Sequence, residues 1–443
     1  MSKEKKILAF GAGKISKPCV QYLLRRGYKV MVVDQFEQNV LRTAGGHPNA
    51  VPVVGNAVAE PEKYIREFAP DVVVCMLPTA FMAQTAKKCL DEGVSMIGAS
   101  YAKEPVRALD AEAKAKGLRI LCEMGVDPGI DHMSAVHKIK EIQAAGGEIE
   151  SFVSVCGALP DLSANNNPIG YKLSWAPESL VGASLRDARI MTDGAVREMN
   201  GGTTYQNPSF MEIKGLGWFE TYCNADSIPY LEAYGIDGAT TIERGTLRYP
   251  GWCEMVTHMQ KLHIFDEEPR DFGGYTYAAL TKELCGMAGD GRGAKACAAE
   301  FLGVEPYSTS IMKLEWLGLF DEKPVMPANG SLRDMITAIY GQKLVFEPGE
   351  KDIVVMQHQY VVREKCGARK RVTSTMVDRG VVSEESAIAR TTGLPMGIGA
   401  HLAASGAVKG TGVLIPTTED IYVPALEELG REGISFAEHE EEA

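Results

Sequence analysis

The stretch KILAFGAGKIS, residues 6–16, decides the fold class of this chain. An apolar run suited to a buried strand leads into two glycines, and a helical pattern follows over residues 16–26. In this strand–turn–helix setting Gly11 allows a tight turn. Gly13 lets the backbone approach a pyrophosphate, which then sits on the free amide groups of the helix N-terminus. The stretch therefore predicts a dinucleotide-binding site.

The residues next to these glycines complete the expected cofactor site. Ser16 stands where such turns usually carry a third glycine, and it is small enough to let the helix pack closely on the strand. We expect Lys14 and Ile15 to contact the cofactor as well. Leu77, which ends a later apolar strand, is expected to contact it from the same edge of the sheet.

An acidic residue closes the second predicted strand. Asp34 follows Gly11 by 23 residues, near the spacing expected for a carboxylate that binds the adenosine ribose. Such a carboxylate accepts hydrogen bonds from the 2′-hydroxyl and repels a 2′-phosphate, and no arginine stands at 35–37, so NAD is favoured over NADP, which stays possible. The alternative is that Asp34 merely caps the next helix.

Strand and helix patterns alternate over the first ~125 residues. Continuous apolar runs between helical segments indicate a parallel sheet covered on both faces, the doubly wound α/β class. The further strands are predicted at 29–33, 51–54, 71–77, 94–97 and 118–121. Beyond residue 125 strands become sparse, which predicts a second α/β (α+β) domain with a mixed sheet. Near the end, separate helices are predicted at 384–392, 396–406 and 424–429.

Composition excludes several classes of function. The net charge of −12 makes a nucleic-acid partner improbable, and the acidic run 438–442 is expected to be a solvated tail. The ten cysteines form no CxxC pair, which favours buried thiols in a cytoplasmic protein. The eight histidines form no ligand cluster, so no metal site is expected. No apolar stretch reaches the ~20 residues that span a bilayer, so no membrane association is expected.

Several long motifs resemble the saccharopine dehydrogenase (saccharopine reductase) family, in its L-glutamate-forming branch. The resemblance covers nearly the whole chain in order. The motifs are ASY at 99–101, GVDPGIDHM at 125–133, SFVSVCG at 151–157, NPIGYKLSW at 167–175, RGTLRY at 244–249 and DIVVMQH at 352–358.

This resemblance implies an architecture and a reaction. It implies a Rossmann domain over 1–126 completed by about 390–436, and a substrate and dimerisation domain over 127–390. A small helical subdomain is inserted at about 262–345. The implied reaction interconverts saccharopine with L-glutamate and 2-aminoadipate 6-semialdehyde by hydride transfer to or from NAD or NADP, as part of lysine metabolism in a cytoplasmic homodimer.

Three candidate catalytic residues are implied by the resemblance. Asp127 is implied to bind the substrate amino group, and its alternative is a turn or cap residue. Tyr101 and Ser100 come after a predicted strand and are implied contacts of substrate or nicotinamide, although Tyr101 could be a packing aromatic. Cys156 ends a strand before Gly157 and could assist proton transfer, or be an inert buried thiol.

The remaining implied substrate and cofactor contacts lie later in the chain. Ser174 is an implied cofactor contact, and Lys172 could attract a carboxylate or be a surface lysine. Thr246, Leu247 and Arg248 match the substrate-binding run of the family. Arg248 would offer a planar fork to a carboxylate, with a structural ion pair as its alternative.

Two departures from the family bear on the substrate. Ala225 stands where the family usually carries an arginine that binds a substrate carboxylate, so either another cation compensates or the substrate lacks that group. The stretch 77–82, LPTAFM, also differs from the relatives. A related secondary-amine or ω-amine dehydrogenase, acting on a carboxypolyamine or lysine-like substrate, and a non-catalytic NAD-binding protein therefore stay open as alternatives.

Overall fold

The computed structural model describes residues 4–382 and 385–443, which form two compact units. The first unit runs to Ile149 and resumes at Val362, and the second comprises Glu150–Val361. These boundaries differ from the expected ones near 126 and 390. The helix α7 (Ile130–Ala144) packs against α16 (Glu419–Arg431), so it belongs with the N-terminal domain rather than with the second domain.

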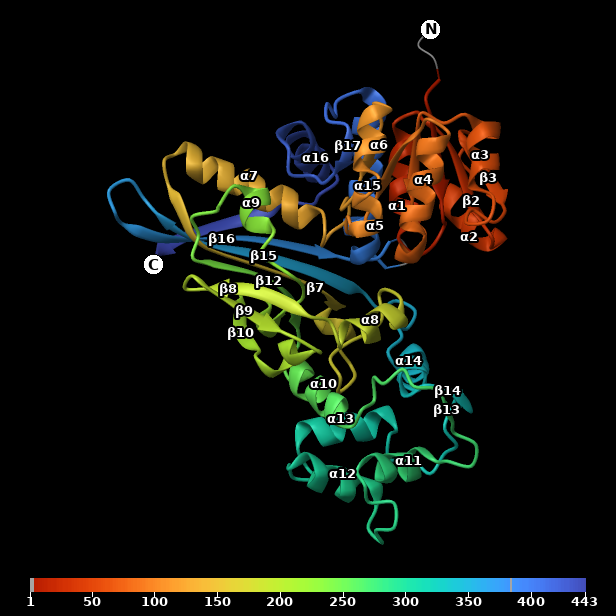
Figure 1. The fold of residues 1–443 in the computed structure, drawn as a ribbon, viewed down its shortest axis with the longest axis vertical. Coiled ribbons are helices and arrows are strands. Elements are labelled where there is room, and N and C mark those ends of the chain that lie inside the picture. The colour runs from red at the N-terminus through yellow and green to blue at the C-terminus, as the bar shows by residue number, and fades with distance from the viewer. Residues whose placement is uncertain (1–3, 383–384) are drawn as a thin grey trace. The chain divides into compact units, whose positions relative to one another are not determined.

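The first unit is built on a seven-stranded parallel sheet in the order β17-β6-β5-β4-β1-β2-β3. The chain leaves β1 toward β2 and β3 on one side and places β4 to β6 on the other, so the order reverses beside β1. This confirms the doubly wound Rossmann fold, and the C-terminal β17 extends the sheet (Figure 1). The strands are β1 Lys6–Phe10, β2 Lys29–Asp34, β3 Ala50–Val54, β4 Val72–Cys75, β5 Ser95–Gly98, β6 Arg119–Leu121 and β17 Gly412–Leu414.

Helices connect these strands and cover the sheet. The first helix packs closely on α15, where a Cβ on Gly393 would lie 2.4 Å from the carbonyl oxygen of Ile15. Only a residue without a side chain permits this approach. The helices of this unit, apart from α7 and α16, are α1 Ser16–Arg25, α2 Glu37–Ala44, α3 Pro61–Phe68, the 3₁₀ turn η1 Thr79–Phe81, α4 Met82–Asp91, α5 Glu104–Arg107, α6 Asp110–Ala115 and α15 Ala387–Ser405.

Two expectations for the C-terminal part are wrong. The two helices predicted at 384–392 and 396–406 are one helix, α15, with the buried Pro395 inside it (Glu384 lies outside the described residues). Pro424 lies inside α16 rather than in its first turn. In both cases packing of apolar neighbours outweighs the helix-breaking tendency of proline.

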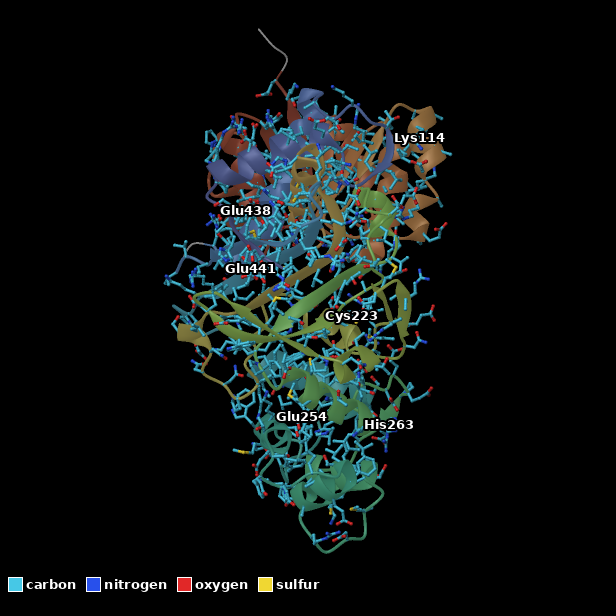
Figure 2. All side chains as sticks on the ribbon, turned by 90° about the vertical axis from the view of Figure 1, so that its left-hand side faces the viewer. Lys114, Cys223, Glu254, His263, Glu438 and Glu441 are labelled. Atoms are coloured by element: carbon cyan, nitrogen blue, oxygen red, sulfur yellow. The ribbon has the colours of Figure 1, made fainter. Side chains whose placement is uncertain are left out.

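The acidic run at the C-terminus is also ordered. It forms β18 (Phe436–Glu442), which pairs antiparallel with β16 (Arg369–Arg379). Glu441 pairs with Arg371 at 3.2 Å and Glu438 with Lys138 at 2.6 Å; both glutamates are labelled in Figure 2. Its glutamates 438 and 440–442 are exposed to solvent, as expected, and the facing cations reduce their mutual repulsion.

The second unit contains a mixed sheet, as expected. Within this unit the strand order is β10-β11-β12-β7-β15, with β8 and β9 attached to β12. β12 runs parallel to β7 and antiparallel to β11. The strands are β7 Glu148–Pro160, β8 Ala188–Thr192, β9 Ala195–Met199, β10 Ser209–Ile213, β11 Gly217–Cys223, β12 Thr241–Arg248 and β15 Asp352–Arg363.

Helices dominate the stretch 262–345 of this unit. They share one hydrophobic core with the sheet, and its members run from Val155 to Val355. A capping box of Ser331 and Asp334 begins α14. The helices are α8 Pro177–Ala183, α9 Tyr230–Tyr234, α10 Trp252–Lys261, α11 Tyr277–Leu284, α12 Ala294–Leu302, α13 Thr309–Leu317 and α14 Leu332–Lys343. The short elements are η2 Leu162–Ala164, η3 Thr203–Gln206, β13 Arg270–Asp271 and β14 Asn329–Gly330. In the described part of the chain, no helix has the length and apolar character to cross a membrane.

Candidate active site

The glycine turn after β1 combines a structural glycine with one that packing does not require. Gly11 has φ +94°, and a Cβ there would lie 2.9 Å from the carbonyl oxygen of Met76, so only glycine fits beside β4. At Gly13 a Cβ would meet no atom within 4 Å. The surrounding protein therefore does not explain Gly13, whereas a ligand that approaches the backbone at the start of α1 would.

Asp34 holds this turn from the neighbouring strand. Its Oδ2 accepts a hydrogen bond from the amide of Ala12 at 2.8 Å, and its Oδ1 accepts one from the amide of Phe36 at 2.9 Å. The N-cap of α2 is Phe36, and no side chain caps that helix. The alternative of Asp34 as a helix cap is therefore wrong: the carboxylate lies against the glycine turn.

The sequence reasoning missed a cation at the same turn. Nη2 of Arg42, on α2, donates to the carbonyl oxygens of Ala12 at 2.7 Å and Gly13 at 3.0 Å. The prediction considered only residues 35–37, whereas Arg42, the sixth residue of α2, reaches back to the glycine turn. Of the other predicted cofactor contacts, Lys14 is exposed, Ile15 is half-buried at the start of α1, and Leu77 is half-buried beyond β4.

The segments after β4, β5 and β6 lie at the same edge of the sheet, because these three strands are parallel neighbours. The hydroxyl of Tyr101, after β5, donates to Oδ1 of Asp127, after β6, at 3.2 Å. The hydroxyls of Ser100 and Thr79 lie 3.2 Å apart. The structure thus brings Tyr101 and Asp127 together. It adds Thr79, which the sequence pointed to only because it lies in the stretch 77–82 that differs from the relatives.

In the second unit, Cys156 and Thr246 are register partners on β7 and β12. Cys156 is buried within β7, which continues to Pro160, so the expected strand end at Cys156 is wrong. Leu247 has no exposed surface and belongs to the hydrophobic core, so its side chain is not available to a ligand. Its carbonyl oxygen accepts a hydrogen bond from Arg248 at 2.8 Å.

Arg248 is a buried cation surrounded by aromatic rings. Its guanidinium carbon lies 4.8 Å from the ring centre of Tyr171 and 5.4 Å from that of Trp252. Among the described residues no carboxylate lies within ion-pair distance of it, and its Nε has no hydrogen-bond partner. Burial lowers the pKa of Arg248, but the nearby Tyr222, Tyr171 and Tyr205 raise it to a greater extent, so the side chain stays cationic. A buried charge without a protein partner is costly, and an anionic ligand would compensate it.

The run 171–175 places its side chains in two different environments. Tyr171 contacts Arg248, whereas Nζ of Lys172 pairs with Oε2 of Glu350 and lies 5.8 Å from the ring centre of Phe346. Lys172 is therefore matched by a carboxylate of its own unit. Ser174 is buried, and its hydroxyl has no hydrogen-bond partner among residues 4–382 and 385–443.

An arginine lies beside the loop that contains Ala225. Nη1 of the exposed Arg186 donates to the carbonyl oxygen of Asn224 at 3.5 Å. Arg189 is occupied by Asp226 in an ion pair at 2.5 Å. Arg186 is thus a cation available at this loop, and the sequence reasoning did not identify it because 38 residues separate it from Asn224.

Comparisons with known proteins agree over nearly the whole chain. Residues 7–121 match the family model of the saccharopine dehydrogenase NADP binding domain, and residues 125–434 match that of the saccharopine dehydrogenase C-terminal domain. The chain is 32% identical to the mitochondrial alpha-aminoadipic semialdehyde synthase of Bos taurus, with 98% of this chain and 48% of the relative covered. It therefore spans about half the length of that relative.

Two fungal relatives match along their whole length. The chain is 31% identical to saccharopine dehydrogenase (NADP(+), L-glutamate-forming) of Schizosaccharomyces pombe, with 98% of both chains covered. It is similar in structure to apo saccharopine dehydrogenase (L-Glu forming) of Saccharomyces cerevisiae, with a TM-score of 0.88, 27% sequence identity and 99% of this chain and 100% of the other covered.

Proposed function

The chain belongs to the saccharopine dehydrogenase family, and from this premise we propose that it interconverts saccharopine with L-glutamate and 2-aminoadipate 6-semialdehyde by hydride transfer with a nicotinamide cofactor. The names of the fungal relatives support the glutamate-forming reaction. The bond that changes is the one between carbon and the secondary amine nitrogen of saccharopine.

Arg248 is the observation that carries this proposal. Saccharopine bears several carboxylates, and a buried guanidinium without an acidic partner in the described chain is suited to bind one of them. The rings of Tyr171 and Trp252 keep the fork in one orientation without neutralising it. Lys172 is not assigned to the substrate, because Glu350 already matches its charge.

The residues of the first unit fit a dinucleotide. Gly11 and Gly13 would admit the pyrophosphate at the start of α1, and Asp34 would accept hydrogen bonds from the adenosine ribose. When bound, the nicotinamide accepts or donates the hydride. Asp127 would hold the substrate amine and take its proton, and the hydroxyl of Tyr101 would orient the carboxylate that does so.

For the cofactor we propose NAD. Asp34 supports this choice, because a fixed carboxylate beside the ribose repels a 2′-phosphate. The names of the fungal relatives and the position of Arg42 favour NADP instead. Both hydrogen bonds from Arg42 to carbonyl oxygens come from a single nitrogen, Nη2. The other nitrogens of its guanidinium could therefore bind an anion such as a 2′-phosphate.

Ala225 supports a second candidate, a dehydrogenase of a related secondary amine that lacks one carboxylate. The loop at Ala225 carries no arginine of its own, and Arg186, which follows α8 in the chain, donates to the backbone of that loop. If Arg186 binds the substrate carboxylate that an arginine at position 225 would bind, saccharopine remains the substrate. If it does not, a carboxypolyamine or lysine-like amine fits better.

Steady-state kinetics with a panel of amines test the proposal. Saccharopine, a carboxypolyamine, lysine and a buffer control are each assayed with NAD and NADP at 340 nm. We expect saccharopine with NAD to give the highest kcat/KM. Turnover of another amine with none of saccharopine would replace the proposal by the second candidate, and cofactor binding without turnover of any amine would indicate a non-catalytic protein.

A further inference from the structure

Behind the loops of Tyr101 and Asp127 lies a buried trio of titratable side chains that the proposed reaction does not use. Nε2 of His132 lies 2.8 Å from Oε2 of Glu123, and Nδ1 lies 3.6 Å from Oδ2 of Asp131. All three residues are at most 2% exposed. Two carboxylates and an imidazole are costly to bury, so their presence needs a reason beyond packing.

Glu123 holds the loop that carries Tyr101 on both sides. Its amide donates to the carbonyl oxygen of Ser100 at 3.1 Å, and its Oε1 accepts from the amide of Ala102 at 3.0 Å. The residues immediately before and after Tyr101 are thereby bonded to one glutamate. Glu123 therefore fixes the backbone on either side of Tyr101.

Asp131 holds the turn that carries Asp127 in a similar way. Its Oδ1 accepts from the amide of Gly129 at 2.5 Å, and its own amide donates to the carbonyl oxygen of Val126 at 3.1 Å. These contacts lie on both sides of Asp127. Because His132 contacts both Glu123 and Asp131, it joins the two loops.

The backbone of Glu123 supports a role beyond packing. Glu123 has φ +60°, a left-handed conformation that side-chain-bearing residues rarely adopt. Glycine would adopt it without strain, so the side chain of Glu123 is retained at a conformational cost. The carboxylate, with its contacts to Ala102 and His132, is what glycine would lack.

We propose that Glu123 and His132 are positioning residues, which keep Tyr101 within hydrogen-bond distance of Asp127. This inference rests on the proposed function for its catalytic consequence. Neither residue needs to touch the substrate. They set the relative position of two groups that do, and a displacement of ~1 Å in such a pair can cost on the order of 10²-fold in rate.

Three variants separate this role from general stability. Glu123→Gly removes the carboxylate without backbone strain, and Glu123→Gln retains an oxygen that accepts from Ala102 while losing the charge. Glu428→Gln is the matched control, because Glu428 is another buried glutamate of this unit, bonded instead to Arg26 and Tyr22. Each variant is assayed as the full chain.

Amide hydrogen exchange over 99–107 and 125–134, together with kcat and the Kd of NADH, supplies the readouts. Glu123→Gly is expected to exchange at least tenfold faster in both segments and to lose on the order of 10²-fold in kcat. Its Kd for NADH should stay within roughly twofold, since the glycine turn is untouched. Glu123→Gln should restore most of the exchange protection and an intermediate kcat.

Several results would overturn the inference. One is unchanged amide exchange in Glu123→Gly, and another is faster exchange in that variant with unchanged kcat. A third is a loss of exchange protection and kcat in Glu428→Gln equal to that in Glu123→Gly. If the wild-type protein turns over no saccharopine, the proposed function fails by itself. In that case amide exchange by itself tests whether Glu123 holds the two loops, since the hydrogen bonds of Ala102 and Gly129 do not depend on the substrate.

Discussion

Arg248 stacks on Tyr171, with 4.8 Å between the guanidinium carbon and the ring centre, and it does so in place of pairing with an acid. A structural ion pair and a ligand-binding arginine respond oppositely to loss of charge. Removal of a structural partner leaves a buried carboxylate unpaired and lowers stability. Removal of a charge that only a ligand neutralises lowers affinity and spares the fold.

We therefore expect Arg248→Met to lose about 2–5 kcal/mol in transition-state binding, roughly 30- to several thousand-fold in kcat/KM for saccharopine. Its Tm without ligand should be unchanged or higher. Arg390→Met is the control: Arg390 pairs with the buried Asp378, so this variant should have a lower Tm. A lower Tm in Arg248→Met with normal kinetics would make Arg248 structural.

Asp34 should set the coenzyme preference. We expect Asp34→Ala to lower the ratio of kcat/KM for NAD to that for NADP by about five- to thirtyfold, because about 1–2 kcal/mol of repulsion toward a 2′-phosphate is removed. Asp34→Asn, which retains an acceptor for the amide of Ala12, controls for the glycine turn. An unchanged ratio in both variants would leave Asp34 with only its structural hydrogen bonds. Selective loss of NADP in Arg42→Gln would identify Arg42 as a 2′-phosphate ligand.

The pair of Lys172 and Glu350 should contribute to stability in a pH-dependent manner. Burial raises the pKa of Glu350, but hydrogen bonds from Lys172, the amide of Glu347 and Asn166 together hold it below its usual value. A carboxyl group with a depressed folded-state pKa stabilises the protein above its unfolded-state pKa of about 4.3. This contribution is lost as the pH falls through the folded-state value.

We expect Glu350→Gln to lower the free energy of unfolding by about 1–3 kcal/mol at pH 7, since Glu350 is only half-buried. Urea unfolding at pH 7 and pH 3 measures this difference, which should shrink at the lower pH. A difference independent of pH would mean that the charge of Glu350 does not contribute.

Arg186 should compensate for Ala225 if saccharopine is the substrate. We expect Arg186→Ala to raise KM for saccharopine about two- to fivefold, equivalent to about 0.5–1 kcal/mol for an exposed ion pair. Ala225→Arg in the same background should restore KM. If neither substitution changes KM, no substrate carboxylate binds at this loop, and the second candidate function gains support.

Thiol reactivity should be confined to one cysteine. Nine of the ten cysteines are buried and Cys366 is exposed. Burial raises the pKa of Cys19 to about 12 and that of Cys75 to about 11, so these thiols stay protonated and unreactive at neutral pH. Iodoacetamide at pH 8 should label one thiol per native chain, at Cys366, as located by peptide mass spectrometry. Rapid labelling of Cys156 would show that the site opens to solvent and would strengthen its catalytic assignment.

Much of the fold was predictable because its signals are local. The strand, glycine turn and helix of residues 6–16 are encoded by neighbouring residues, and the alternation of strands and helices after them indicates a parallel sheet. Predicted helix ends were wrong at prolines where packing with distant residues stabilises the helix, as at Pro395, which lies within one continuous helix. Family motifs identified Asp127, Tyr101 and Arg248, but not how these residues are held.

By itself, the sequence determined the strands, the glycine turn and the family, since each depends on residues close together in the chain. Only the tertiary structure decided which side chains meet. It placed Arg42 on the glycine turn, Tyr101 beside Asp127, Glu350 on Lys172 and aromatic rings rather than an acid around Arg248. The physical reason is that a charge acquires its role from the partner that neutralises it, and folding brings that partner from a distant part of the chain.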